Sequence, residues 1–213
     1  MKRLLQDAEQ GAGAPVEEAA SRAFQRDGNA RKKETGGFPK YALAVLPSTR
    51  SSDFEAVPEH VLTAWTKTVV LGQFPVHRDE VVRRVVDHLG QRVTESRTQK
   101  ITELLFSLVG RDKIVSDGDH FLVKGEPIAS PRDRSDYKEF RQMDFVHDAE
   151  VKAAIYWVVR SSFGCQEEDA KSQVVRLLGV IRREDALDRV ALLLKKMVKQ
   201  NELAHRGGLF RSL

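Results

Sequence analysis

The stretch from Val76 to Val123 constrains the fold more than any other part of this sequence. An apolar-periodic helix is predicted from Val76 to Leu89, and after a polar break a second helix is predicted from about Arg97 to Gly110. A small β-hairpin is predicted over 113–123, because its turn contains Asp117-Gly118 between two short apolar runs. Helix, turn, helix and hairpin, in this order, predict a winged helix.

Length, charge and cysteine usage narrow the class of protein. With 213 residues and 41% hydrophobic side chains, the chain can bury the cores of two small domains. A net charge of +4, from 35 basic and 31 acidic residues, leans only weakly towards a polyanionic partner. The single cysteine, Cys165, excludes an internal disulfide and a thiolate-rich zinc site, which fits a reducing cytoplasm.

Neither a membrane span nor a signal peptide is expected. The sequence contains no apolar run approaching the roughly 20 residues that cross a bilayer. At the N-terminus, Gln6, Asp7 and Glu9 interrupt the apolar stretch immediately after Leu5. We therefore expect a soluble cytoplasmic protein without a membrane partner.

The segments before the central stretch carry weaker signals. Residues 1–37 are rich in Ala, Gly and charged residues, which predicts a disordered or linker tail. Tyr41–Leu46 is a short apolar run stopped by Pro47, and it reads as a strand or extended segment that docks on the first domain. A helix with an apolar face is predicted to start at Val57-Pro58 and to pack behind the helix-turn-helix.

The C-terminal part repeats the same order of elements. After a charge-alternating connector at 127–146, helices are predicted over 148–162, 167–178 and 184–200, followed by a hairpin around 202–211. Apolar residues of the two parts align at a constant offset of 89 positions. The aligned residues are Val69-Val70 with Val158-Val159, Leu104-Leu105 with Leu193-Leu194, Ile114 with Leu203, and Phe121 with Phe210. This repetition predicts a mainly α protein with small β-hairpins, made of two tandem winged-helix domains at 38–126 and 147–213.

Polar residues that could contact DNA lie at the start of the second helix of the first domain. In helix-turn-helix proteins this end of the helix meets base edges in the major groove, and Arg, Gln, Thr and Lys suit that role. The candidates are Arg97, Thr98, Gln99 and Lys100, with Arg92 just before the helix and Lys113 at the hairpin. The alternative is a solvated helix face in a domain that contacts proteins.

The second domain has a stronger basic stripe. From Cys165 to Leu213 the chain has ten basic and seven acidic residues, which favours phosphate contact. The candidate contacts are Arg182, Arg183, Arg189, Lys195, Lys196, Lys199 and Arg206. Leu192 in the same stripe would also suit a protein interface.

No catalytic or cofactor site is expected. The six histidines are scattered without metal-ligand spacing, and the chain lacks a GxxxxGK[ST] phosphate loop. His77 and His147 lie near predicted helix starts, where capping or packing explains them. We therefore expect a protein without an enzymatic activity of its own.

Several motifs together resemble a known family. They are 73–81 (QFPVHRDEV), 131–135 (PRDRS), and Phe163-Gly164 followed by 176–182 (RLLGVIR). Over 41–213 the chain resembles the uncharacterised C-terminal domain of large bacterial superfamily-one helicase proteins, where it follows a nuclease-like domain related to very-short-patch repair endonucleases. The chain departs from the family at Gln73-Phe74, where Glu-Gly is usual, and at His147, where a proline is common.

The resemblance implies a DNA-associated role in helicase-driven DNA processing or defence, with the catalytic parts elsewhere. Our leading hypothesis is a module that holds duplex or forked DNA for a helicase or nuclease, in cis or in trans. One alternative is a docking or dimerisation module that binds proteins. A second alternative is a stand-alone transcription regulator.

Overall fold

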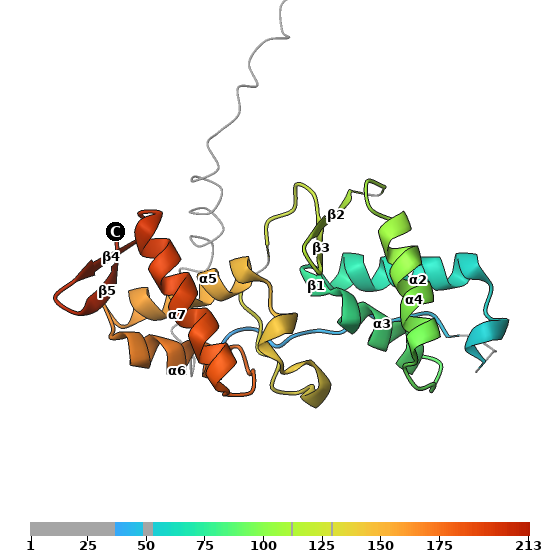
Figure 1. Cartoon of the computed structure of the whole chain (residues 1–213), viewed down its shortest axis with the longest axis horizontal. Helices are drawn as coiled ribbons and strands as arrows, with labels where there is room; N and C mark the ends of the chain where they lie inside the picture. The colour runs from blue at the N-terminus through green and yellow to red at the C-terminus, as the bar shows by residue number, and fades with distance from the viewer. Residues whose placement is uncertain (1–36, 49–52, 112, 129) are drawn as a thin grey trace, which may run out of the picture. The chain divides into compact units, whose positions relative to one another are not determined.

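The computed structural model describes residues 37–48, 53–111, 113–128 and 130–213. Gly37–Leu213 form one compact unit that is mainly helical, with small antiparallel sheets, as the sequence predicts (Figure 1). The predicted tail at 1–37 lies outside the described residues except for Gly37. Two hydrophobic cores lie within the unit, and we call the elements around them the first module (Phe54–Val123) and the second module (Asp148–Ser212).

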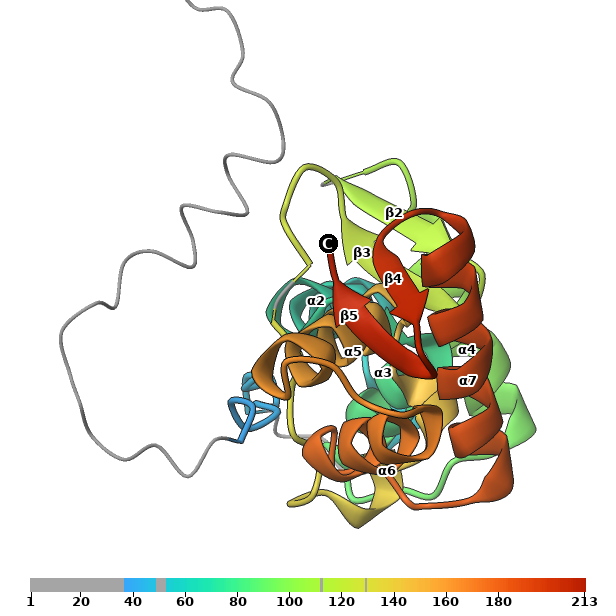
Figure 2. The ribbon, with the colours of Figure 1, turned by 90° about the vertical axis from the view of Figure 1, so that its left-hand side faces the viewer.

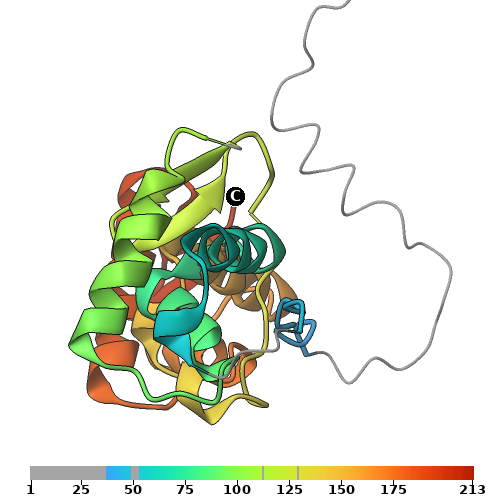
Figure 3. The ribbon, with the colours of Figure 1, turned by 90° about the vertical axis from the view of Figure 1, so that its right-hand side faces the viewer.

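The first module is built from three helices and a three-stranded sheet. Its elements are the 3-10 helix η1 (Phe54–Ala56), α2 (Glu59–Gln73), β1 (Val76–His77), α3 (Arg78–Asp87), α4 (Glu95–Ser107), β2 (Ile114–Asp117) and β3 (His120–Val123). The sheet is antiparallel in the order β1-β3-β2, with Val76 opposite Phe121. Figure 3 shows α4 crossing beside α2 and α3. The predicted helix at 76–89 is shorter than expected, because Val76 and His77 pair with β3 before α3 begins.

Helical apolar spacing explains why these segments pack as they do. Val81 and Val85 of α3 are fully buried, as are Ile101 and Leu105 of α4. Burying a side chain of this kind contributes about 1.5–3 kcal/mol relative to leaving it in water. Thr94 caps α4, since its side-chain oxygen accepts a hydrogen bond from the Arg97 backbone N–H at 3.4 Å.

The second module has its own three helices and a two-stranded hairpin. Its elements are α5 (Asp148–Ser161), α6 (Glu167–Leu177), α7 (Glu184–Lys199), β4 (Leu203–Arg206) and β5 (Leu209–Ser212). Figure 2 shows the hairpin beside α7. Gly207 and Gly208 form the turn with φ of 60° and 77°, a conformation that glycine adopts without steric cost.

In both modules, a residue between the first two helices pairs with the second strand of the hairpin. Cys165 forms an isolated antiparallel bridge with Phe210, and their backbone N–H groups and carbonyls exchange hydrogen bonds of 3.1 and 2.9 Å. Val76 and Phe121 are paired in the same way in the first module. The spacing between Val76 and Cys165, and between Phe121 and Phe210, is 89 positions.

The segment between the modules is packed, although its alternating charges suggest a solvated connector. It contains the 3-10 helices η2 (Lys138–Phe140) and η3 (Met143–Phe145). Because extended backbone points successive side chains to opposite sides, Arg132 and Arg134 face inward while Asp133 faces Lys40. The Arg134 side chain is completely buried and donates a hydrogen bond of 3.0 Å to Glu80.

Residues 37–48, which we call the strap, run along this network. The strap is extended, one of the two forms predicted for Tyr41–Leu46. The hydroxyl of Tyr41 donates to the Glu80 carboxylate and accepts a hydrogen bond from Gln73 at 2.8 Å. Burial and the neighbouring Glu80 carboxylate raise the pKa of Tyr41 well above its ordinary value, so the phenol stays protonated. Further along, the Ala44 backbone bonds to Gln73 and Arg84 at 3.0 and 2.7 Å.

Candidate nucleic-acid interface and the cleft beside it

The candidate contacts of the first module lie where predicted, but several of their side chains are engaged within the protein. The Arg97 guanidinium donates to the Arg92 carbonyl at 2.8 Å and lies over the Phe54 ring at 5.5 Å. Lys100 forms an ion pair with Glu59. Gln99 donates to Glu103 one turn further along α4, at 2.9 Å. These three side chains can bind DNA only if they first give up their contacts within the protein.

The other three first-module candidates have different surroundings. Arg92 is exposed before α4, and Thr98 is partly buried in the first turns of that helix. Lys113 is exposed next to β2 and has a φ of 63°. These residues do not form a continuous basic surface with α4, because Arg97 and Lys100 are directed to acidic or aromatic partners of η1 and α2.

In the second module the C-terminal half of α7 carries an exposed basic face. Lys199 lies four residues after Lys195 and three residues after Lys196, so the three side chains share one side of the helix. Arg206 is exposed in β4, which follows α7 in the chain. Within the described part of the chain, none of these four side chains takes part in an ion pair or hydrogen bond. We call these four residues the basic face.

The remaining second-module candidates do not belong to this face. Arg182 and Arg183 are exposed just before α7, beside the acidic first turn formed by Glu184 and Asp185. Arg189 is an internal clamp. Its guanidinium donates to Asp148 at 2.7 Å and to the carbonyl of Met143 at 2.7 Å, among other acceptors.

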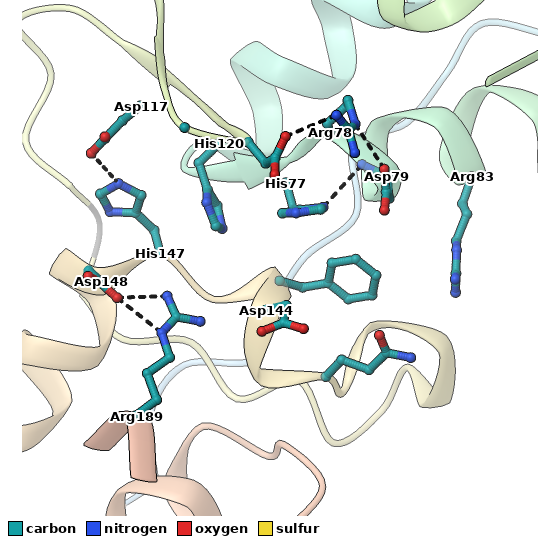
Figure 4. Close-up of a pocket in the computed structure, with 14 residues that line it drawn as sticks. His77, Arg78, Asp79, Arg83, Asp117, His120, Asp144, His147, Asp148 and Arg189 are labelled. Atoms are coloured by element: carbon teal, nitrogen blue, oxygen red, sulfur yellow. Dashed lines mark hydrogen bonds and ion pairs between the residues drawn. The ribbon is translucent and has the colours of Figure 1, made fainter. Parts of the chain in front are cut away.

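A cleft of about 520 Å³ lies between the two modules (Figure 4). It is bounded by the turn between β2 and β3, the starts of α3 and α5, the end of η3, and Arg189 of α7. Its side chains include three histidines, three arginines and five aspartates. Polar groups from both modules therefore converge on one space that the linear sequence does not reveal.

Three histidines form a row along the cleft (Figure 4). His120 lies between His77 and His147, with a ring-centroid distance of 5.1 Å to each and edge-to-face geometry on both sides. His77 caps α3 by accepting the Asp79 N–H at 3.1 Å, and His147 caps α5 by accepting the Ala149 N–H at 3.2 Å. The predicted capping roles of His77 and His147 are confirmed.

The position of His120 makes protonation unfavourable. Burial, followed by the neighbouring rings of His77 and His147 and the charge of Arg189, lowers the pKa of His120 to about 3. Burial also lowers the pKa of His77. The Nε2 atom of His120 is buried without a hydrogen-bond partner among the described residues. His120, at the centre of the row, is therefore neutral at pH 7.

Two of the three arginines of the cleft are compensated by carboxylates. Arg78 forms ion pairs of 3.0 Å with Asp79 and with Asp119, and Arg189 pairs with Asp148. His147 contacts Asp117 at 3.0 Å through Nε2. Because five aspartates face three arginines, the cleft lacks the excess positive charge that phosphate binding requires.

Sequence reasoning missed the histidine row, the partly buried Arg132 and the fully buried Arg134. The two motifs His77-x-x-Glu80 and His147-x-x-Glu150 carry a signal, since each places a cap residue three positions before a fully buried glutamate. Arg134 then binds Glu80, and Arg132 binds Glu150 at 2.8 Å. His120 gives no comparable local signal, because its neighbours in the cleft come from distant parts of the chain.

Across 37–48, 53–111, 113–128 and 130–213, no group of three or more His, Cys, Asp or Glu side chains is arranged to hold a metal ion. In the same ranges, every helix is too short or too polar to span a bilayer.

Comparison with protein-family models, with curated proteins and with solved structures gives no significant match. The resemblance to the helicase-associated family therefore stays a prediction.

Proposed function

We propose that this chain is a non-enzymatic DNA-binding module made of two tandem winged-helix domains, which serves a helicase or nuclease in cis or in trans. The order helix, extended residue, helix, helix, hairpin supports this proposal in both modules. So does the common spacing of 89 positions between their paired residues. The association with a helicase rests on the sequence resemblance.

The observation that carries the proposal is the basic face of the second module. Three lysines of α7 and Arg206 are exposed and unpaired within the described part of the chain. A flexible ammonium or guanidinium group that has no internal partner binds a phosphate without first breaking a contact. Each such contact releases condensed counterions, so it adds affinity that falls with salt and is independent of sequence.

The first module would have a secondary role. Arg97, Gln99 and Lys100 occupy the helix that reads base edges in helix-turn-helix proteins, but each already has a partner. We therefore assign most of the affinity to the second module. Discrimination among DNA structures would depend on α4 and on the exposed residues Arg92 and Lys113 next to it.

A protein-docking function is the second candidate, because exposed apolar side chains lie on the same helices. Leu192 of α7 is 66% exposed between the acidic and basic ends of the helix, and Phe106 of α4 is 49% exposed. Single exposed apolar residues are common on protein surfaces. For this reason we rank docking below DNA binding.

Charge reversal tests the proposal. The variant Lys195→Glu/Lys196→Glu/Lys199→Glu should bind a labelled DNA duplex at least about tenfold more weakly and reduce the salt slope by about 2–3, at roughly 0.9 per phosphate contact. The matched control reverses Lys124, Lys138 and Arg176, which are exposed cations outside the predicted contact set. Equal losses in the two variants would mean that only net charge matters and that the basic face is not the binding surface.

The competing docking function has its own signature. Leu192→Ala should leave DNA affinity within about twofold, because this side chain offers no phosphate contact. If Leu192→Ala abolished capture of a helicase or nuclease partner while the lysine variant kept it, the docking function would replace DNA binding.

A further inference from the structure

The third helix of each module, α4 or α7, is joined to the first helix of its module by an equivalent ion pair. Lys100 of α4 pairs with Glu59 of α2, and Arg189 of α7 pairs with Asp148 of α5 at 2.7 Å. Both members of the second pair lie 89 positions after their counterparts in the first pair. The two modules are therefore equivalent in how α4 and α7 are attached, as well as in the order of their elements.

The two modules are repeated side by side in the same direction. Figure 1 shows α4 and α7 running the same way, each with its hairpin on the same side. In both end views the two helices lie along one face of the molecule (Figure 2 and Figure 3). A two-fold axis would place these helices in opposite directions or on opposite faces. The second module is instead related to the first mainly by a displacement from one module to the next.

Two extended segments contact both modules and hold them in this arrangement. The Arg132 guanidinium donates to the last backbone carbonyl of α2 at 2.9 Å and to the Glu150 carboxylate of α5 at 2.8 Å. In the strap, Phe38 packs edge-to-face on Trp157 of α5 with a centroid distance of 5.3 Å, whereas Leu46 is buried in the first core. We therefore expect α4 and α7 to keep their relative orientation in solution.

The surfaces that the two modules expose at equivalent positions differ in charge. Each residue of the basic face has a counterpart 89 positions earlier, and none of these counterparts is basic. For Lys195, Lys196, Lys199 and Arg206, in this order, the counterparts are Phe106, Ser107, Gly110 and Asp117. All four counterparts are exposed. A geometrical repeat thus has one end that attracts phosphates strongly and one end that does not.

This arrangement bears on the class of DNA that the chain fits. Dimers with a two-fold axis match palindromic sites, because the symmetry of the protein is repeated in the DNA. Modules repeated in one direction, with unlike charges, match DNA whose two ends differ. Duplex DNA carries about one charge per 1.7 Å of its axis, about twice the density of a single strand. The basic face therefore favours a duplex arm over an unpaired arm.

We propose that the chain binds forked DNA with one fixed polarity, in which the basic face holds the duplex arm and the first module lies towards the unpaired arms. The inference rests on the proposed DNA-binding function, and it adds the class of DNA and the direction in which the chain lies on it. One copy of the chain suffices, because α4 and α7 contact the same DNA molecule along one face. A palindromic site offers this arrangement no advantage.

Localised cleavage of DNA by the full chain tests this polarity. An iron chelate that generates hydroxyl radicals is attached through Lys124→Cys in the first module or through Ser212→Cys in the second. Both positions are exposed and lie outside the predicted contacts. On forked DNA, the Ser212→Cys chelate should cut mainly the duplex arm, and the Lys124→Cys chelate mainly the junction and the unpaired arms. The wild type, whose single cysteine is buried, controls for background cleavage.

Two comparisons make the result specific to polarity. On a blunt duplex, whose two ends are alike, each chelate should cut equally towards both ends. Adding Phe106→Lys/Ser107→Lys to either chelate protein gives the first module two lysines of the basic face. On the fork, this change should bring the cuts in the two arms to within about twofold of each other. The matched control Ala42→Lys/Ser130→Lys adds the same charge at exposed positions of the strap and the connector, and it should keep the original pattern.

Three results on the fork would overturn the polarity. They are the same cleavage pattern from both chelates, the reverse pattern, or cuts as symmetric as those on the blunt duplex. Each of them requires that the chain binds the DNA, which fluorescence anisotropy measures separately. Absence of binding would refute the proposed function and this inference with it, whereas binding without polarity would refute the inference alone.

Discussion

Lowering the pH from 7 to 5 should destabilise the folded protein through His120. The pKa of this side chain is lowered to about 3 in the folded state, whereas an unfolded histidine titrates near about 6.5. Between these two values the unfolded chain takes up a proton that the folded chain does not. The free energy of unfolding therefore rises with pH across this window. The contribution of His120 to stability is fully present above about pH 6.5 and is lost as the pH falls towards about 3.

The size of the effect follows from the width of the window. Each pH unit between the two pKa values changes the free energy of unfolding by about 1.4 kcal/mol. Acidification from pH 6.5 to pH 5 should therefore cost about 2 kcal/mol from His120 alone. His77, whose pKa is also lowered by burial, adds to the loss in the same direction.

Comparing the pH dependence of stability between the wild type and the variant His120→Asn isolates the contribution of His120. Asparagine cannot titrate, and its amide can replace the hydrogen bond that the His120 ring makes with the backbone of Phe145. Urea unfolding at pH 7, 6 and 5 should show that the wild type loses about 2 kcal/mol more than the variant over this range. Parallel losses in the two proteins, or an NMR titration midpoint of His120 near 6.5, would refute the reasoning.

Other substitutions should change stability by amounts that urea or thermal unfolding can measure. Gly179→Ala should cost about 3 kcal/mol, because its Cβ would lie 2.2 Å from an Asp133 carboxylate oxygen at a φ of +65°. The matched Gly90→Ala, with the same φ and open space, should cost only about 1 kcal/mol. Arg134→Met should cost about 3–5 kcal/mol by leaving the buried Glu80 carboxylate unpaired, and adding Glu80→Gln should recover part of it. Phe163→Gly should raise the melting temperature, because it relieves a positive φ worth about 1 kcal/mol.

Helices and hairpins were predictable because apolar periodicity records burial directly. Val81, Val85, Ile101 and Leu105 recur at helical spacing, and all four are fully buried. The hairpin at Asp117-Gly118 followed from turn chemistry. Helix ends were less well predicted, since pairing across the sheet shortened the helix that was expected to start at Val76.

The side-chain environments were less predictable than the elements. Arg97 and Lys100 lie on the expected helix, but their partners Phe54 and Glu59 come from elements about 40 residues earlier. Arg132 and Arg134 belong to the predicted connector, and their contacts could not be predicted, because an extended segment with alternating charge has the same pattern whether or not one side is buried. Only the tertiary contacts show whether one side of such a segment is buried.

The histidine row shows the same limit. His77, His120 and His147 belong to β1, β3 and the start of α5, and their spacing in sequence follows no local periodicity. Helix capping could be predicted for two of them because the cap depends on neighbours in the chain. The burial of His120 depends on both modules and could not.

The most direct test of DNA binding is fluorescence anisotropy of the full chain with labelled duplex, forked and single-stranded DNA across a salt series. Binding at micromolar or lower concentration should weaken steeply as salt rises, with a slope of about −3 or steeper if each residue of the basic face neutralises one phosphate. A preference for one DNA structure would identify the substrate that the module holds. Absence of binding to all three DNAs at low salt would contradict the account and leave protein docking as the function of these helices.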